Sequence, residues 1–168
     1  LALSPDGALL ASGGQDRVVR VWRLADRTAR PAELGPISDD TRVLRFTPDG
    51  ALLLAGDDNG EVRAWDLPLA TGPVSPATLA GRILAHHAGR ILALGFDDGA
   101  LVSIGRAGDV VATRLRNLSG NRTSDGAAAR AGFAADRLDA TRVTAAASLP
   151  AERLAVGLAD GAILIRQR

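Results

Sequence analysis

The chain has 168 residues, enough for one domain with a hydrophobic core, and a formal net charge of only +1. Its content of 46% hydrophobic and 23% charged residues is that of a globular protein, not a disordered one. The near-neutral charge argues against a dedicated nucleic-acid binder, which would show a basic stripe. The absence of cysteine excludes disulfides and thiolate metal sites, and no apolar run approaches the length of a transmembrane helix.

The stretch from residue 3 to residue 24, LSPDGALLASGGQDRVVRVWRL, sets the pattern for the chain. Its SPDG segment predicts a β-turn, because proline fixes φ at the second turn position and glycine suits the last. An apolar run, a Gly-Gly-Gln-Asp turn and an alternating run that reaches Trp22 follow. The same layout returns 43 residues later as TPDGALLLAGDDNGEVRAWDL, where Trp65 stands in place of Trp22.

A repeat of about 40–45 residues closed by tryptophan is typical of a β-propeller blade. The two units resemble WD40 repeats, since SPDG, LASGG, Asp16 and the terminal tryptophan follow one another in that family's order. The resemblance implies an all-β fold of antiparallel four-stranded blades in a WD40-like β-propeller.

Glycines at the ends of the second strands anchor four units: Gly13, Gly56, Gly105 and Gly157. An apolar residue follows six positions after each glycine, at Val19, Val62, Val111 and Ile163. The positions three residues after each glycine hold Asp16, Asn59, Gly108 and Asp160. The position nine residues after each glycine, the tryptophan column, holds Trp22 and Trp65 in the first two units and Arg114 and Arg166 in the third and fourth. We therefore predict one propeller segment of four units, at residues 1–34, 37–85, 87–139 and 140–168.

Each unit is predicted to contain three consecutive strands and a fourth, outer one. In the second unit these are residues 42–46, 51–55, 61–65 and 82–85. The first two are apolar at nearly every position, which predicts that neighbouring blades cover both of their faces. Outer strands are expected to be more polar, as residues 28–33 are, and Pro31 suits an edge strand.

Two long connections and the chain ends carry further expectations. Residues 67–80 and 117–135 are predicted surface loops, and whether the longer one is functional stays open. The last unit ends after its third strand, at 162–165, and the chain begins inside a strand pattern without methionine. We therefore expect the C-terminal part of a larger ring, with a closed ring of four blades as the alternative.

The resemblance also implies structural roles. WD40 repeats often carry a hydrogen-bond network of a histidine before the first strand, a serine or threonine in the second, a turn aspartate and the tryptophan. The residues that match are Ser12, Asp16, Trp22, Asn59, Trp65, His87 and Asp160. No unit contains the full set, so a partial network is expected, with the blades held mainly by apolar packing.

Several possible sites are weaker than their structural alternatives. His86 and His87 suggest zinc, but a zinc site needs three or four ligands, and only Asp97 and Asp98 could assist. The acidic stretch 57–61 lacks the ligand spacing of an EF-hand and is better explained as a turn. No phosphate-binding loop, no GxSxG elbow and no local support for a Ser-His-Asp triad are present. We predict no catalytic residue, no metal and no cofactor.

Arginines stand at the entrance to the first strand of three units, at Arg42, Arg90 and Arg142. In WD40-like proteins the loops entering that strand, with the turn after the second strand, form the usual peptide-binding face. We therefore predict protein-binding residues at Gln15, Arg42, Asp58, Arg90 and Arg142. A ring of arginines would favour acidic or phosphorylated partners; the alternative is that these are solvated surface arginines.

The resemblance implies a non-catalytic scaffold for protein–protein interaction, without nucleic-acid or membrane partners. The alternative is a regulatory or sensor module of a larger bacterial signalling enzyme, an NTPase, kinase or protease, whose catalytic domain lies upstream. The lysine-free composition favours a GC-rich bacterial source. A third hypothesis is a propeller enzyme with an active site at the central channel. The scarcity of histidine, tyrosine and acidic clusters argues against it. By default, we expect the protein to be cytoplasmic.

Overall fold

The structure is a computed structural model and describes residues 1–26, 28–67, 81–97, 100–115, 143–149, 153–158 and 163–165. These residues form antiparallel β-sheets and include no α-helix, hence no helix able to cross a membrane. The predicted all-β class is confirmed.

The first two sheets have four strands each. The first contains β1 (Ala2–Leu3), β2 (Leu9–Ser12), β3 (Val19–Arg23) and β4 (Ala32–Leu34). The second contains β5 (Thr41–Phe46), β6 (Leu52–Asp57), β7 (Glu61–Asp66) and β8 (Arg82–His86). Strands that are neighbours in sequence are neighbours in each sheet, as tight antiparallel connections allow. The four-stranded antiparallel sheets predicted from the repeat are confirmed here.

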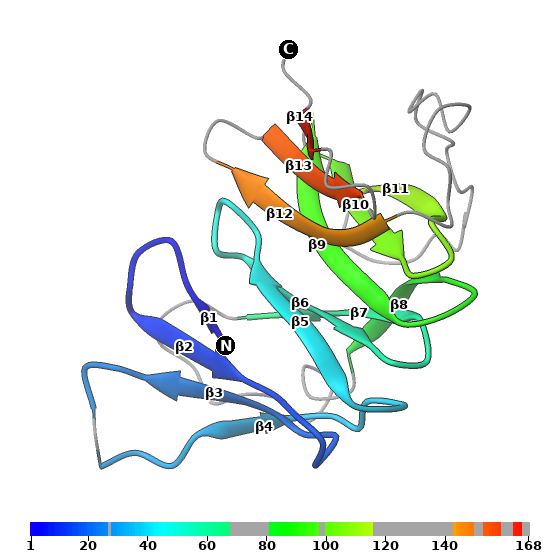
Figure 1. Cartoon of the computed structure of the whole chain (residues 1–168). Coiled ribbons are helices and arrows are strands. Elements are labelled where there is room, and N and C mark those ends of the chain that lie inside the picture. Colours follow the sequence, from blue (N-terminus) through cyan, green and yellow to red (C-terminus); the bar gives the residue numbers. More distant parts are fainter. Residues whose placement is uncertain are drawn as a thin grey trace.

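Three strands are described in each of the remaining two sheets. The third contains β9 (Ile91–Asp97), β10 (Ala100–Gly105) and β11 (Val110–Arg114). The fourth contains β12 (Val143–Leu149), β13 (Arg153–Leu158) and β14 (Ile163–Ile165). The sheets pack in chain order, with β1 beside β5, β5 and β6 beside β9, and β12 beside β9 (Figure 1).

The two faces of a sheet pack against different neighbours, because side chains alternate along a strand. On the second sheet, Leu53 and Trp65 pack in one core cluster with Ala11 and Val21 of the first sheet. The adjacent Leu54 belongs to a second cluster, shared with the third sheet. Strand β6 is accordingly buried at all six positions, which explains its uninterrupted apolar sequence.

Glycines lie where consecutive sheets approach most closely. A Cβ atom added at Gly56 would lie 2.5 Å from the side chain of Ile91, at the start of the next sheet. A Cβ atom at Gly13 would lie 3.0 Å from Thr41, at the start of the second sheet. The repeated glycine therefore makes room for the first strand of the following sheet.

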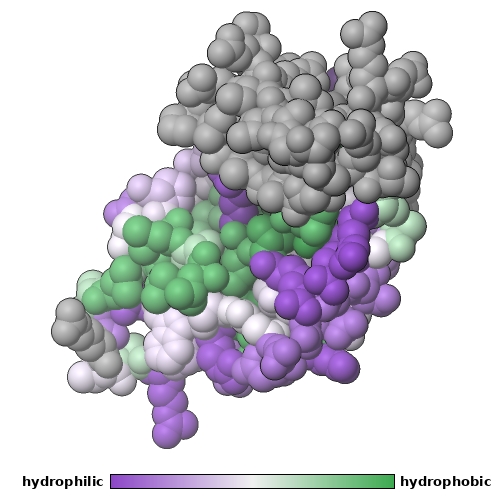
Figure 2. Space-filling model, in the orientation of Figure 1, coloured by the Kyte–Doolittle hydropathy of each residue, from purple (hydrophilic) through white to green (hydrophobic). Residues whose placement is uncertain are grey.

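The first sheet leaves its other face open in the described part of the chain. Trp22 occupies the position of Trp65, since each is paired with the equivalent leucine of the preceding strand. Trp65 is fully buried, whereas 38% of the Trp22 surface is exposed. Figure 2 shows apolar residues gathered in a band over the first and second sheets.

Two sequence-based assignments are wrong. The outer strand of the first unit is β4, Ala32–Leu34, and not residues 28–33. The reason is local: the Asp26 carboxylate accepts hydrogen bonds from the backbone N–H groups of Thr28 and Ala29 and from the Thr28 hydroxyl, which holds these residues in a turn.

The repeat register of the third unit is wrong by one residue. Leu101, paired in the way of Leu53, faces Thr113, so Thr113 and not Arg114 occupies the tryptophan column. Ile104 pairs with Val110 as Gly56 pairs with Val62, so the glycine column passes through Ile104. Gly105 misled the alignment because it lies at an irregularity of the β9–β10 pairing.

Candidate interaction face and buried polar network

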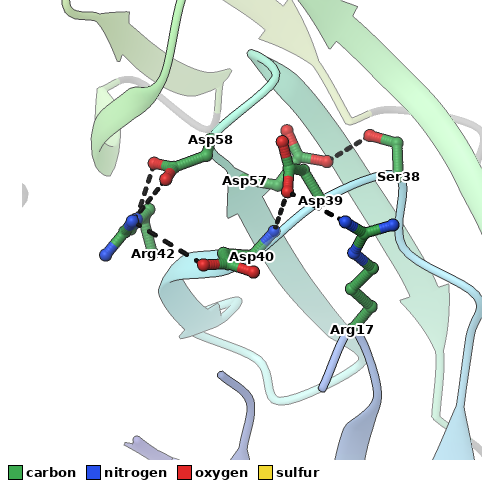
Figure 3. Close-up of polar contacts among 7 residues, drawn as sticks. All are labelled: Arg17, Ser38, Asp39, Asp40, Arg42, Asp57 and Asp58. Carbon is green, nitrogen blue, oxygen red and sulfur yellow. Dashed lines mark hydrogen bonds and ion pairs between the residues drawn. The ribbon is translucent and has the colours of Figure 1, made fainter. Parts of the chain in front are cut away.

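Three predicted binding residues meet at the end of the molecule where β5 and β9 begin, and Figure 3 shows two of them, Arg42 and Asp58. Asp58 directly follows β6, Arg42 is the second residue of β5, and Arg90 directly precedes β9. Arg42 Nε donates a hydrogen bond to Asp58 Oδ1 at 2.6 Å, and Arg42 Nη2 donates to Asp58 Oδ2. Arg90 Nε lies 3.4 Å from Asp58 Oδ1. Two arginines from successive sheets thus share one carboxylate.

Further carboxylates surround these arginines. Asp40 Oδ2 lies 3.8 Å from Arg42 Nη2, and Asp39 Oδ1 lies 3.7 Å from Nη2 of Arg17 in the turn between β2 and β3. The described part of this face therefore alternates positive and negative groups. We name this set, Arg17, Asp39, Asp40, Arg42, Asp58 and Arg90, the charged face.

The guanidinium of Arg42 lowers the pKa of Asp58 below its ordinary value of 3.8, against a smaller opposing effect of burial. A lowered folded-state pKa stabilises the protein above the unfolded value, and this contribution is lost as the pH falls through the folded-state value. We expect the Asp58 carboxyl resonance to titrate below pH 3.8 in an NMR titration. In Arg42→Ala its pKa should rise, whereas Arg30→Ala, at an exposed connection, should leave it unchanged. An unchanged Asp58 pKa in Arg42→Ala would contradict the assignment.

Asp57, next to Asp58, has a different role because it is fully buried. Its Oδ1 accepts a hydrogen bond from the Glu61 backbone N–H at 2.8 Å, and its Oδ2 accepts one from the Ser38 hydroxyl (Figure 3). Asp57 therefore joins the turn after β6 to the loop that enters β5. The sequence analysis missed this role; an acidic residue that directly continues an apolar strand is its only signal.

The other predicted binding residues are less informative. Gln15 is exposed in the turn between β2 and β3. Arg142 lies outside the described residues, as do the structural candidate Asp160, Asp98 and the predicted loop 117–135.

The most complete buried polar network joins the second and third sheets. His87 follows β8, and its Nδ1 lies 2.5 Å from Asp109 Oδ2 while its Nε2 lies 2.7 Å from Ser103 Oγ. If the carboxylate accepts from Nδ1–H, Nε2 is left to accept from the Ser103 hydroxyl. This matches three members of the network that the resemblance implies, with Thr113 at the tryptophan position. Ser103 was missed because the misplaced register put Ile104 at the serine position of the repeat. Asp109 was missed for another reason: even in the corrected register the aspartate column holds Ala107, and Asp109 stands two residues later.

Serine, histidine and aspartate in hydrogen-bond contact also make up a hydrolase triad, although no local sequence motif supports one here. In a hydrolase the serine oxygen must be reachable by substrate. Ser103 is fully buried within β10, and the His87 side chain is also fully buried. The geometry therefore describes a structural hydrogen-bond network.

Replacing Ser103 with alanine should leave His87 Nε2 without its partner in a buried environment. We expect the free energy of unfolding to fall by about 1–3 kcal/mol, measured by urea denaturation. The matched control is Ser12→Ala, because the Ser12 hydroxyl accepts from Trp22 Nε1 at 3.2 Å at a more exposed position. Equal losses in the two variants would show that burial of the network is unimportant.

The other structural candidates do not form a complete network. Ser12 and Trp22 are joined as described, but Asp16 pairs with Arg20 and not with them. Asn59 is exposed in the turn between β6 and β7. Within the described residues, no group of three or more histidine, aspartate or glutamate side chains is placed to hold a metal ion.

Comparison with known proteins agrees with this geometry. Residues 1–23 and 37–66 match the WD40 family model (WD domain, G-beta repeat). The chain is similar to the crystal structure of the computationally designed Ika4 protein, with TM-score 0.64, 20% identity, and coverage of 98% of this chain and 88% of that one. It is also similar to the computationally designed Ika8 protein, with TM-score 0.58, 21% identity and 94% coverage of this chain. No curated protein gives a significant match.

At these identities the structural likeness concerns the fold alone, and the chain spans only 42% of the Ika8 chain. The family match adds the repeat type, because each matched stretch contains the three inner strands of one sheet and its tryptophan. WD40 repeats are modules of protein-interaction scaffolds and are generally non-catalytic. The first two sheets, which contain the matched residues 1–23 and 37–66, are therefore similar to WD40 repeats in sequence and in strand order.

Proposed function

We propose that the chain is a non-catalytic scaffold that binds a segment of a protein partner on the charged face. The observation that carries this proposal is the convergence of Arg42 and Arg90 on Asp58 across the junction of two sheets. Both arginine side chains are 40% exposed, so their donors can be reached from solvent. The burial of the Ser103–His87–Asp109 network supports the non-catalytic part.

The partner segment is proposed to be acidic or phosphorylated. A guanidinium carries five N–H donors, and one shared carboxylate satisfies only part of those that Arg42 and Arg90 present. An incoming carboxylate or phosphate could pair with the remaining donors in the bidentate geometry that arginine favours. Asp58 then acts as an internal competitor, which holds the two side chains in place before binding.

The test is selection of a displayed peptide library on the immobilised full chain, followed by measured affinities of the selected peptides. Acidic peptides should be enriched, and the double variant Arg42→Ala/Arg90→Ala should weaken their binding by about tenfold or more. Arg30→Ala serves as control, because Arg30 is exposed in the connection between β3 and β4. Selected peptides without acidic residues, or unchanged affinity in the double variant, would contradict the proposal.

A further inference from the structure

A cavity of about 400 Å³ lies at the other end of the inner strands, away from the charged face. It opens where β1 and β5 pass into their turns, beside β9. Its walls combine the apolar side chains of Leu3, Pro5, Phe46, Pro48 and Phe96 with polar surface in about equal share, to which Arg45 and Thr47 belong. This volume lies within the range of natural small-molecule sites, in which polar groups placed among apolar side chains fix the orientation of the ligand.

The cation Arg45 is among the described residues that line this cavity. Its guanidinium carbon lies 5.5 Å from the centroid of the Phe96 ring, which places the charge over the ring face. Among the residues that the structure describes, no carboxylate pairs with Arg45, whereas Arg42 pairs with Asp58 and Arg63 pairs with Glu61. Burial lowers the pKa of the Arg45 guanidinium, as expected for a charge removed from water without a counter-ion.

The fold itself does not require an arginine at this position. Arg45 faces Leu54 in the β5–β6 pairing, next to the last pair, Phe46 with Leu53. The pair at the same place is Ala2 with Ala11 in the first sheet and Gly95 with Val102 in the third. The first and third sheets thus use small residues where the second has arginine. Small side chains at the equivalent positions also limit how far the neighbouring strands can fill the space around Arg45.

We propose that this cavity is a binding site for a small molecule that joins a carboxylate to a short apolar body. The carboxylate pairs with the Arg45 guanidinium and supplies a counter-ion that the described part of the chain does not. The apolar body lies against Leu3, Phe46 and Phe96. This site is separate from the charged face, so its failure would leave the proposed function untouched.

The probe is hexanoate, titrated calorimetrically into the full chain, with hexan-1-ol as the uncharged analogue of the same chain length. Hexanoate should bind about tenfold more tightly than hexan-1-ol, because a hydrogen bond to a charged group contributes more than a neutral one. This comparison uses the unaltered chain and so does not depend on any variant folding. Equal affinity of the two probes, or no detectable binding of hexanoate, would overturn the proposal.

A variant locates the site. Arg45→Gln removes the charge but keeps a polar side chain, and hexanoate should then bind no better than hexan-1-ol. Arg106→Gln is the matched control, since Arg106 is exposed in the turn between β10 and β11. Circular dichroism confirms that both variants are folded. Hexanoate affinity retained in folded Arg45→Gln, or lost in Arg106→Gln, would show that binding occurs elsewhere.

Discussion

Replacing Trp65 with alanine should lower the free energy of unfolding by about 3–5 kcal/mol, the usual cost of deleting a large buried aromatic side chain. Trp65 is fully buried in the core between the first and second sheets, where it belongs to the cluster of Val21, Leu34 and Phe46. Its loss opens a cavity at the junction of two blades and weakens the contact that joins them. Urea denaturation followed by circular dichroism measures the loss.

The matched control is Trp22→Ala, at the equivalent position of the first sheet. Because 38% of Trp22 is exposed, its replacement should cost only about 1–2 kcal/mol. If Trp65→Ala does not fold, Trp65→Phe and Trp22→Phe allow the same comparison at smaller cost. Similar losses at the two positions would mean that the sheet junction contributes little to stability.

Replacing Gly60 with alanine should cost about 2–5 kcal/mol, from two separate causes. Gly60 has φ of +86°, a left-handed conformation that strains any residue with a Cβ atom. An added Cβ would also collide with the carbonyl oxygen of His87 and lie 2.8 Å from that of Gly89. These are backbone atoms of the loop that enters the next sheet, so they cannot move aside as a flexible side chain could.

Two other glycines separate these causes. Gly7 has φ of +72° but no atom within 4 Å of an added Cβ, so Gly7→Ala measures backbone strain alone, about 1–2 kcal/mol. Gly14 has neither feature, and Gly14→Ala should be neutral or slightly stabilising. The denaturation midpoint should therefore be highest for Gly14→Ala, lower for Gly7→Ala and lowest for Gly60→Ala. A cost at Gly60 no larger than at Gly7 would remove the collision from the explanation.

The parts of the fold that local chemistry determines were predictable from sequence. The turns after β1 and β5 are built alike, since Ser4 and Thr47 each donate a hydroxyl hydrogen bond, at 2.5 Å, to the aspartate two residues later. These hydrogen bonds depend only on neighbouring residues, so the SPDG and TPDG segments are enough to predict the turns. The positions of Trp22 and Trp65 follow from the same repeat.

The parts that depend on contacts between sheets were not predictable. The irregular pairing at Gly105 shifted the third unit by one residue and hid Ser103, while Asp109 lies outside the aspartate column in either register. The acidic turn after β6 was predicted, but the different roles of its two aspartates were not. Asp57 is buried and accepts a hydrogen bond from Ser38, whereas Asp58 pairs with two arginines. The sequence did not single out Arg45, because the cavity that it lines is formed by residues of three strands that are distant in the sequence.

The difference between the two sheet faces has a spectroscopic consequence. Trp22 and Trp65 are the only tryptophans of the chain, one on an open face and one inside a sheet junction. Trp65 should emit at shorter wavelength and resist acrylamide, whereas Trp22 should be quenched readily. If another sheet, from a further blade or a second copy, came to cover the first sheet, quenching of Trp22 would fall while Trp65 stayed unchanged. Intrinsic fluorescence can therefore follow assembly at this face without any added label.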